Sequence, residues 1–272
     1  MNIQEALKDL FDDKRRPYFE KLAGKVMPAI EMHKKFDLLD DPKWRNVSEH
    51  CLMEAARVEI IAGLIGLSQD IIKDLVTTSA LHDFYKKYEI GAIQEELKSG
   101  GNGWGAIYKT ADERNRHIKE ANFNDRVKRL VNASGGNPET LFKAKKILDQ
   151  SNITEEDWAF LFVYYVDSYT RGSNWAETAD NLNDVDRRLD KNASNPNYSK
   201  QNFNVKKFDD DPLFRGKSIF QAMKEISHMI EKRLCVLIKD KTGIMINSLE
   251  LPEFIDSEIM SIIIKLRERE TL

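Results

Sequence analysis

Apolar residues recur along most of this chain at intervals of three and four positions, the spacing that places them on one face of an α-helix. Near the N-terminus one such face contains Ile3, Leu7 and Phe11, and a second runs from Phe19 to His33. No stretch alternates apolar and polar residues convincingly in the manner of a half-buried β-strand, and no segment repeats at a fixed period. The pattern therefore predicts an all-α protein that begins with two helices.

Glycine, proline and capping residues divide the rest of the chain into further helices. We expect these helices over residues 48–66, 68–83, 106–133, 139–150, 154–171, 219–238 and 255–266. Ser68 and Thr154 are predicted N-caps, and Asp157 stands three residues after Thr154, as in a capping box. Residues 192–211 are rich in Asn, Ser, Lys and Asp and show neither period, which predicts a long loop.

Length, composition and charge narrow the class of protein. Of the 272 residues, 41% are hydrophobic and 32% are charged, as in globular proteins, and no apolar run is long enough to cross a bilayer. The N-terminus lacks the basic start and apolar stretch of a secretion signal, so we expect a cytoplasmic protein with no membrane partner. The net charge of -3 provides no overall field that would attract nucleic acid. Cys51 and Cys235 form no CxxC pair, which argues against a zinc knuckle or a disulfide framework.

Four residues carry the candidate chemistry, since imidazole and carboxylate are side chains that bind divalent cations. His82 and Asp83 are adjacent at the end of a predicted helix, His50 lies on the preceding helix, and Asp167 follows the apolar run 159–166. A carboxylate in such apolar surroundings needs a cation or several hydrogen-bond donors. We therefore predict that His50, His82, Asp83 and Asp167 bind one divalent metal ion.

Three of these residues also have a structural alternative. His50 could be a packed side chain on an apolar helix, and Asp83 could cap a helix that starts at Phe84. Arg171 lies one helical turn after Asp167 and could be its ion-pair partner. The presence of all the candidate ligands in one chain favours metal binding over these separate explanations.

The order His50, His82-Asp83 and Asp167 resembles the H…HD…D signature of the HD-domain metal-dependent phosphohydrolases. Around His50 the sequence is most similar to the 5'-deoxynucleotidase-like branch. The resemblance implies an HD-domain helical bundle with extra N- and C-terminal helices, in which the whole chain 1–272 forms one elaborated domain. The core that carries the resemblance would cover about residues 44–190. Helical flanks would cover residues 1–43 and 212–272, and a loop would cover residues 192–211.

Asp83 is expected to act in catalysis as well as in metal binding, and three further residues are candidates for a catalytic role. Much of the family has a lysine at the position of Lys86, whereas the nucleotidase branch tends to have an acid there. We expect Lys86 to contact a phosphate or to stabilise developing charge, although it could be a solvated lysine. Glu54, on the same helix face as His50, and His117 are the candidates for an acid or base. His117 could equally be a second-metal ligand or a surface residue in a basic stretch.

Substrate contacts are expected from one aromatic and three basic side chains. The segment from Trp44 to His50 resembles one in the nucleotidase branch where an Arg and a nearby aromatic help to hold the nucleotide. Trp44 and Arg45 are therefore predicted to contact the substrate, although Arg45 could be a surface arginine. Arg57 and Arg171 could neutralise charge on a transferred phosphoryl group.

Together these residues predict a metal-dependent phosphohydrolase that acts on a nucleotide or related small phosphoester through a metal-activated water. The ligands suit one divalent ion, Mn, Co, Ni, Mg, Fe or Zn, and do not distinguish among them. Two other functions stay open, an HD-type di-iron oxygenase and a non-catalytic module that binds a metal or a nucleotide. The apolar faces of the last two helices could form a homodimer or complete the core of a monomer.

Overall fold

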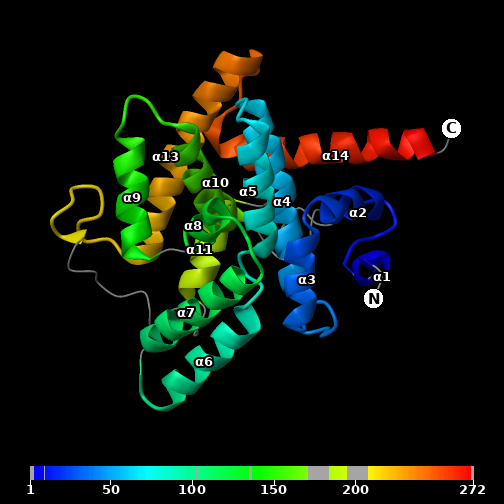
Figure 1. The fold of residues 1–272 in the computed structure, drawn as a ribbon. Helices are drawn as coiled ribbons and strands as arrows, with labels where there is room; N and C mark the ends of the chain where they lie inside the picture. The colour runs from blue at the N-terminus through cyan, green and yellow to red at the C-terminus, as the bar shows by residue number, and fades with distance from the viewer. Residues whose placement is uncertain are drawn as a thin grey trace.

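The structure is a computed structural model, and it describes residues 3–8, 10–101, 103–134, 137–170, 184–194 and 208–270. Within these ranges every regular element is a helix, which confirms the all-α prediction (Figure 1). The elements are α1 (Ile3–Lys8), α2 (Arg16–Lys25), α3 (Met27–Lys35), α4 (Arg45–Leu64), α5 (Gln69–Leu81), α6 (Lys86–Lys98), α7 (Trp104–Glu120), α8 (Asp125–Val131), α9 (Pro138–Leu148), α10 (Glu155–Tyr169), α11 (Val185–Ser194), α13 (Ile219–Thr242), the 3-10 helix η3 (Ser248–Glu250) and α14 (Leu251–Glu270).

Helix α4 lies in the middle of the fold and packs side by side with α5 (Figure 1). It is buried on nearly all sides, because apolar and small residues such as Leu52, Ala55 and Val58 surround its axis. Helix α10 is buried in the same way and packs against α4, α5, α11 and α13. Helices that are apolar all round belong in the core of a domain. Several polar side chains of α4, among them His50, Glu54 and Arg57, are therefore held in the interior.

Turns and caps set the ends of these central helices. After α4, Gly66 has a φ of 73°, a left-handed conformation that glycine adopts without strain, and the chain reverses into α5. Ser68 precedes α5 as predicted, but its hydroxyl donates to Glu155 Oε2 (2.7 Å) and does not cap its own helix. Thr154 does cap α10 as predicted, since its hydroxyl accepts the backbone N–H of Asp157 (3.2 Å).

Two of the predicted helices are each divided in the structure. The helix expected from Phe19 to His33 is two helices, α2 and α3, because Pro28 has no N–H to donate one turn back and its ring would clash there. The stretch 106–133 lies partly in α7 and partly in α8, with Asn122 between them at a φ of 58°. A break of this kind leaves the apolar spacing nearly unchanged, so periodicity alone overlooks it.

Two further helices are not predicted from the sequence. Helices α6 and α11 are both mostly polar. Their few apolar residues, such as Val185 and Leu189 of α11, recur at helical spacing but are too sparse to stand out in the sequence. The loop predicted over 192–211 overlaps the last residues of α11, and residues 195–207 lie outside the described part of the chain. These omissions matter because α6 begins at Lys86 and α11 places Arg188 near the candidate site.

The last two predicted helices are confirmed as α13 and α14, and both are longer than predicted. Helix α13 begins with a capping box formed by Ser218 and Gln221 and ends before Gly243, which has a φ of 77°. Helix α14 extends along α4 and α2 toward the C-terminus (Figure 1). Its residues Ile255 and Ile259 are fully buried, so its apolar face completes the core of this chain.

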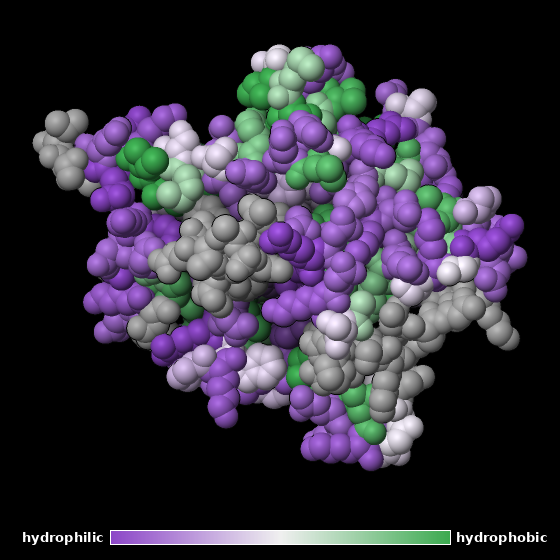
Figure 2. Space-filling model, turned by 180° about the vertical axis from the view of Figure 1, so that it is seen from behind, coloured by the Kyte–Doolittle hydropathy of each residue, from purple (hydrophilic) through white to green (hydrophobic). Residues whose placement is uncertain are grey.

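The surface is mainly polar on the side turned away in Figure 1, with apolar side chains in small separate groups (Figure 2). The most exposed apolar residues near the end of α13 are Val236, Met245 and Leu249. Among the described helices, none has the length and apolar character needed to cross a membrane.

Candidate metal centre

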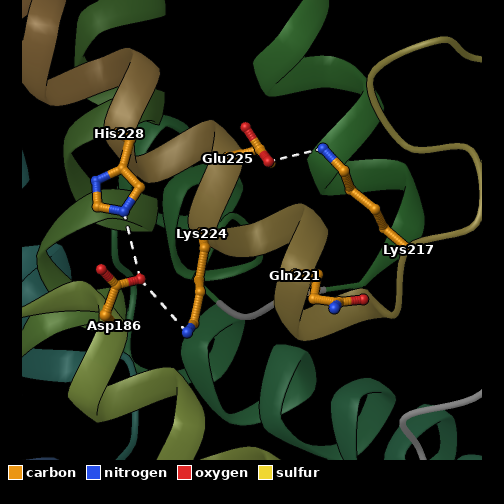
Figure 3. A pocket seen from close by; sticks show the side chains of 6 residues that line it. All are labelled: Asp186, Lys217, Gln221, Lys224, Glu225 and His228. Carbon is orange, nitrogen blue, oxygen red and sulfur yellow. Dashed lines mark hydrogen bonds and ion pairs between the residues drawn. The ribbon is translucent and has the colours of Figure 1, made fainter.

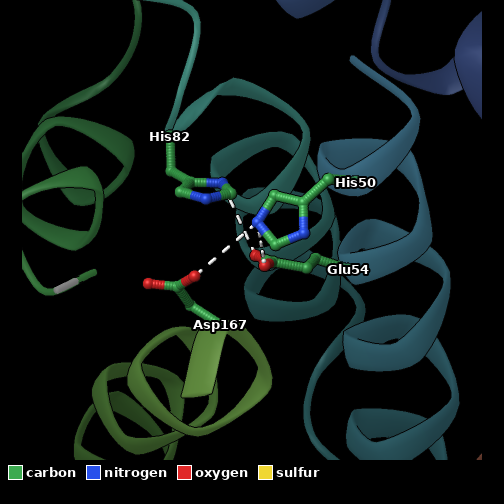
Figure 4. Close-up of side chains that lie close together, drawn as sticks. All are labelled: His50, Glu54, His82 and Asp167. Carbon is green, nitrogen blue, oxygen red and sulfur yellow. Dashed lines mark ion pairs between the residues drawn. The ribbon is translucent and has the colours of Figure 1, made fainter. Parts of the chain in front are cut away.

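Four side chains from three helices converge in the interior of the fold (Figure 4). His50 and Glu54 lie one turn apart on α4, so the helix itself places them side by side. His82 follows the last residue of α5, and Asp167 lies two residues before the end of α10. The structure therefore brings together three of the predicted ligands, His50, His82 and Asp167, and adds Glu54.

The distances within this group match those between ligands of one cation. His50 Nε2 lies 2.8 Å from Glu54 Oε1 and 3.6 Å from Asp167 Oδ1. One ligand atom from each of the four residues lies within 4.8 Å of the other three. Ligand atoms about 2.1 Å from a metal are about 3.0 Å apart when adjacent in an octahedron and about 3.4 Å apart in a tetrahedron. The group could therefore hold a single ion.

Several polar atoms of the group are buried without a hydrogen bond. Among the described residues, His50 Nδ1, Glu54 Oε1 and His82 Nε2 have no hydrogen-bond partner. Glu54 Oε1 lies 2.8 Å from His50 Nε2, so these two atoms form an ion pair when His50 is protonated. Buried polar atoms left unpaired are costly, by about 1–3 kcal/mol each. A cation held by Glu54 Oε1 and His82 Nε2 would remove that cost, so the donor set fits a metal.

The charges of the group also favour a bound positive charge. Although burial disfavours a charged imidazole, the carboxylates of Glu54 and Asp167 raise the pKa of His50 to about 9. Burial likewise opposes ionisation of Asp167, yet His50, His82 and Arg188 hold its pKa well below the usual range. In the absence of a metal, a proton on His50 thus supplies the positive charge. Metal ligation would displace that proton.

Buried hydrogen bonds hold the two histidine ligands in place. The backbone carbonyl of Ser79 can only accept, so His82 Nδ1 donates to it (2.9 Å) and leaves the Nε2 lone pair for a metal. The buried side chain of His33 makes two further hydrogen bonds: its Nε2 donates to the Ala80 carbonyl (2.8 Å), and its Nδ1 accepts from the Ser48 hydroxyl (2.9 Å). His33 therefore ties the end of α5 to the start of α4, two residues before each histidine ligand.

Asp83 lies beside the four-residue group and is not part of it. Its Oδ2 is 3.7 Å from His82 Nε2, and its Oδ1 is 3.5 Å from Lys86 Nζ. The alternative role of Asp83 as a cap for a helix starting at Phe84 is wrong, because the next helix begins at Lys86. Ligation by Asp83 stays a prediction. Glu54, expected as an acid or base, lies within the group that could hold a metal ion.

Trp44 and Arg45, which are predicted to contact the substrate, make local contacts near the start of α4. Trp44 packs against Leu38, Val47 and Cys51, and the Arg45 guanidinium donates to the Leu39 carbonyl (2.9 Å). These contacts place both side chains at the start of α4, where they hold local structure.

The predicted residues Arg57 and His117 are not brought into the group either. Arg57 is buried in an ion pair with Asp256 of α14 (2.8 Å). His117 of α7 packs against the rings of Phe36 and Tyr85, and its Nδ1 lies 3.2 Å from Glu120 Oε2. Arg171 lies outside the described residues, as does any contact between it and Asp167.

Arg188 is a residue near the centre that sequence reasoning missed. Its Nε donates to the Asp167 carbonyl (3.2 Å), and its Nη2 lies 3.5 Å from Asp167 Oδ1. No motif marks this arginine, and the polar helix that carries it is not predicted. Glu54 did carry a signal, namely its position four residues after His50 on one helix face.

A separate polar pocket of about 230 Å³ lies along α11 and α13 (Figure 3). Its charged side chains are paired with one another: Lys224 and His228 each lie 3.4 Å from Asp186, and Lys217 lies 2.7 Å from Glu225. None of its lining residues belongs to the metal group. Asp186 and Arg188 are two residues apart on α11 and therefore point to nearly opposite sides of that helix.

Comparisons of the chain with protein-family models, with curated proteins and with solved structures find no match. The interpretation of the site therefore depends on its own geometry.

Proposed function

We propose that this chain is a metal-dependent phosphohydrolase that acts on a nucleotide or a related small phosphoester. The observation that carries the proposal is the convergence of His50, Glu54, His82 and Asp167, with one ligand atom each within 4.8 Å of the others. Two histidines and two carboxylates suit divalent ions from Mg to Zn, with positions left for water and substrate. Three of these residues, His50, His82 and Asp167, also stand in the order of the H…HD…D signature that the sequence resembles, whereas Glu54 has no counterpart in it.

Different side chains around the centre would bind the metal ion, orient the attacking water and neutralise charge on the phosphoryl group. His50, Glu54, His82 and Asp167 would hold the ion, which would lower the pKa of a bound water and polarise a phosphoryl oxygen. Burial opposes ionisation of Asp83, but Lys86 and His82 outweigh it and lower the Asp83 pKa to about 2. The ionised Asp83 carboxylate can therefore accept a hydrogen bond from the attacking water and orient it. Lys86, beside Asp83, would neutralise charge that accumulates on the phosphoryl group.

The first test is a comparison of Glu54→Gln with Glu59→Gln, because both change one glutamate to its amide on the same helix. Glu59 pairs with Lys25 at the surface, away from the group. After removal of metal with a chelator, the wild type and Glu59→Gln should each take up one divalent ion per chain. Glu54→Gln should take up less, because an amide oxygen carries no charge for the ion. Equal metal content in all three proteins would refute the ligand role of Glu54.

The second test measures turnover of the metal-loaded protein. Phosphate release from nucleotides and other small phosphoesters, lost on treatment with chelator and in Glu54→Gln, would support the proposal. Two irons per chain with oxygen consumption would support the oxygenase instead. Metal and nucleotide binding without turnover of any phosphoester would leave only a binding module.

A further inference from the structure

The metal group is reached by solvent from one edge. The side chains of Glu54 and His82 are 1% exposed and that of His50 is 7% exposed, whereas those of Asp167 and Asp83 are 22% and 18% exposed. Among the described residues, Asp167 and the neighbouring Asp83 therefore line the open edge of the group. A ligand that approaches a metal here must pass Asp83 and Asp167.

One cationic side chain stands beside each of these aspartates. Lys86, at the start of α6, has its Nζ 3.5 Å from Asp83 Oδ1. Arg188, on α11, has its Nη2 3.5 Å from Asp167 Oδ1. The two cations are 23% and 22% exposed, so each has donors that can face the open edge. The edge is thus bordered by positive charge from two separate helices.

These ion pairs are loose. Charge-assisted hydrogen bonds to a carboxylate are about 2.7–2.9 Å long, whereas both pairs here measure 3.5 Å. A divalent ion bound to the group would compete with Lys86 and Arg188 for the carboxylate charge. Metal binding would therefore weaken the attraction of Asp83 to Lys86 and of Asp167 to Arg188, and both cations could then donate to an anion. Glu89, 3.4 Å from Lys86, would still pair with part of that ammonium.

Given the hydrolase proposed above, we infer that Arg188 and Lys86 receive two oxygens of a terminal phosphoryl group while a third oxygen faces the metal. A phosphomonoester has three terminal oxygens, which match these three positive partners. A phosphodiester has only two terminal oxygens and one negative charge, so it leaves one partner unpaired. The inferred substrate class is therefore a phosphomonoester, and Arg188 is a residue that positions it.

The experiment compares Arg188→Met with Arg187→Met in the full-length, metal-loaded protein. Arg187 is the adjacent residue on α11 and pairs with Asp184 at the surface (3.3 Å). The probe is inorganic phosphate, titrated calorimetrically, with metal content and circular dichroism measured for each variant. We expect Arg188→Met to weaken phosphate binding by about tenfold or more, with one metal retained. Arg187→Met should bind phosphate as the wild type does.

Lys86→Met provides a second measurement. We expect it to weaken phosphate binding as Arg188→Met does, because Lys86 is the other cation at the open edge. Arg188→Lys keeps the charge and should recover part of the lost affinity. Phosphate binding that is unchanged in both methionine variants, or absent in the wild type with metal, would overturn the inference. Loss of metal from Arg188→Met would also overturn the inference. In that case Arg188 would affect phosphate binding only by holding Asp167 in place for the metal.

Kinetics with p-nitrophenyl phosphate and bis(p-nitrophenyl) phosphate then test the substrate class. The wild type should prefer the monoester, and Arg188→Met should raise KM for it more than it lowers kcat. Preference for the diester would overturn the assignment of the class. If neither ester is hydrolysed while phosphate binding still requires metal and Arg188, the proposed hydrolase fails and the anion site stands.

Discussion

The buried ion pair between Arg57 and Asp256 yields the sharpest prediction about stability. Arg57 Nε and Nη2 donate to the two carboxylate oxygens of Asp256 (2.8 and 2.9 Å), and Nη1 donates to Thr170 Oγ1 (2.8 Å). The Arg57 side chain is 1% exposed, whereas that of Asp256 is 16% exposed. The pair joins α4 to α14, so its loss should loosen the C-terminal helix.

The two single substitutions should differ in cost because the two partners differ in burial. Asp256→Ala leaves a buried guanidinium without its counter-ion, a change that costs about 3–5 kcal/mol. Arg57→Met leaves the carboxylate, which can turn toward water, so we expect a smaller cost of about 1–3 kcal/mol. The double variant Arg57→Met/Asp256→Leu removes both charges and should be within about 1 kcal/mol of the wild type.

Urea unfolding followed by circular dichroism measures these free energies. The control is Glu59→Ala, which removes a more exposed pair between α4 and α2 and should cost under about 1 kcal/mol. A double variant as unstable as the sum of the single variants would refute the view that the pair acts as a unit. If Arg57→Met leaves stability unchanged and instead weakens phosphoester binding, Arg57 acts on substrate and the structural interpretation fails.

Three further predictions concern protons and backbone conformation. Burial lowers the pKa of His33 from 6.5 to about 4, so its contribution to stability is present above pH 6.5 and is lost as the pH falls through 4. The difference in free energy of unfolding between the wild type and His33→Gln, measured with urea, should fall by up to roughly 3 kcal/mol between pH 6.5 and pH 4. A difference that stays constant with pH would contradict this. Because the His50 pKa is raised to about 9, metal affinity should rise about tenfold per pH unit below that value, and calorimetry that finds no pH dependence would exclude a displaced proton. Gly243→Ala, at a φ of 77°, should cost about 1 kcal/mol, whereas Gly24→Ala in α2 should stabilise, as thermal unfolding of both will show.

The main helices could be predicted because their apolar residues are dense and regular. Helices α4 and α10 are buried on nearly every side, so their sequences are apolar over long stretches. Helices α6 and α11 could not be predicted in this way, since they are polar and owe their formation to the elements that they contact. The break between α2 and α3 depends on one residue, Pro28, within an otherwise continuous apolar pattern.

The candidate site could be predicted in part for a similar reason. His50, His82 and Asp167 stand out in sequence because each interrupts an apolar segment. Their convergence depends on how α4, α5 and α10 pack, which spacing along the chain does not reveal. Arg188 carries no such signal, because an arginine on a polar helix is ordinary until its neighbour Asp167 is known.

The arrangement of the four donors has a consequence for how a metal would affect the fold. His50 and Glu54 are fixed relative to each other by one helical turn, whereas His82 and Asp167 stand near the ends of two other helices. An ion bound to all four would join α4, α5 and α10 where α5 and α10 end, and there the last carbonyls of a helix lack helical partners. Binding would then stabilise the folded chain by about 2.7 kcal/mol at a free metal concentration 100 times Kd. By the same linkage, any contact that sets the relative positions of these helices, such as the His33 bridge, also sets the affinity for the metal.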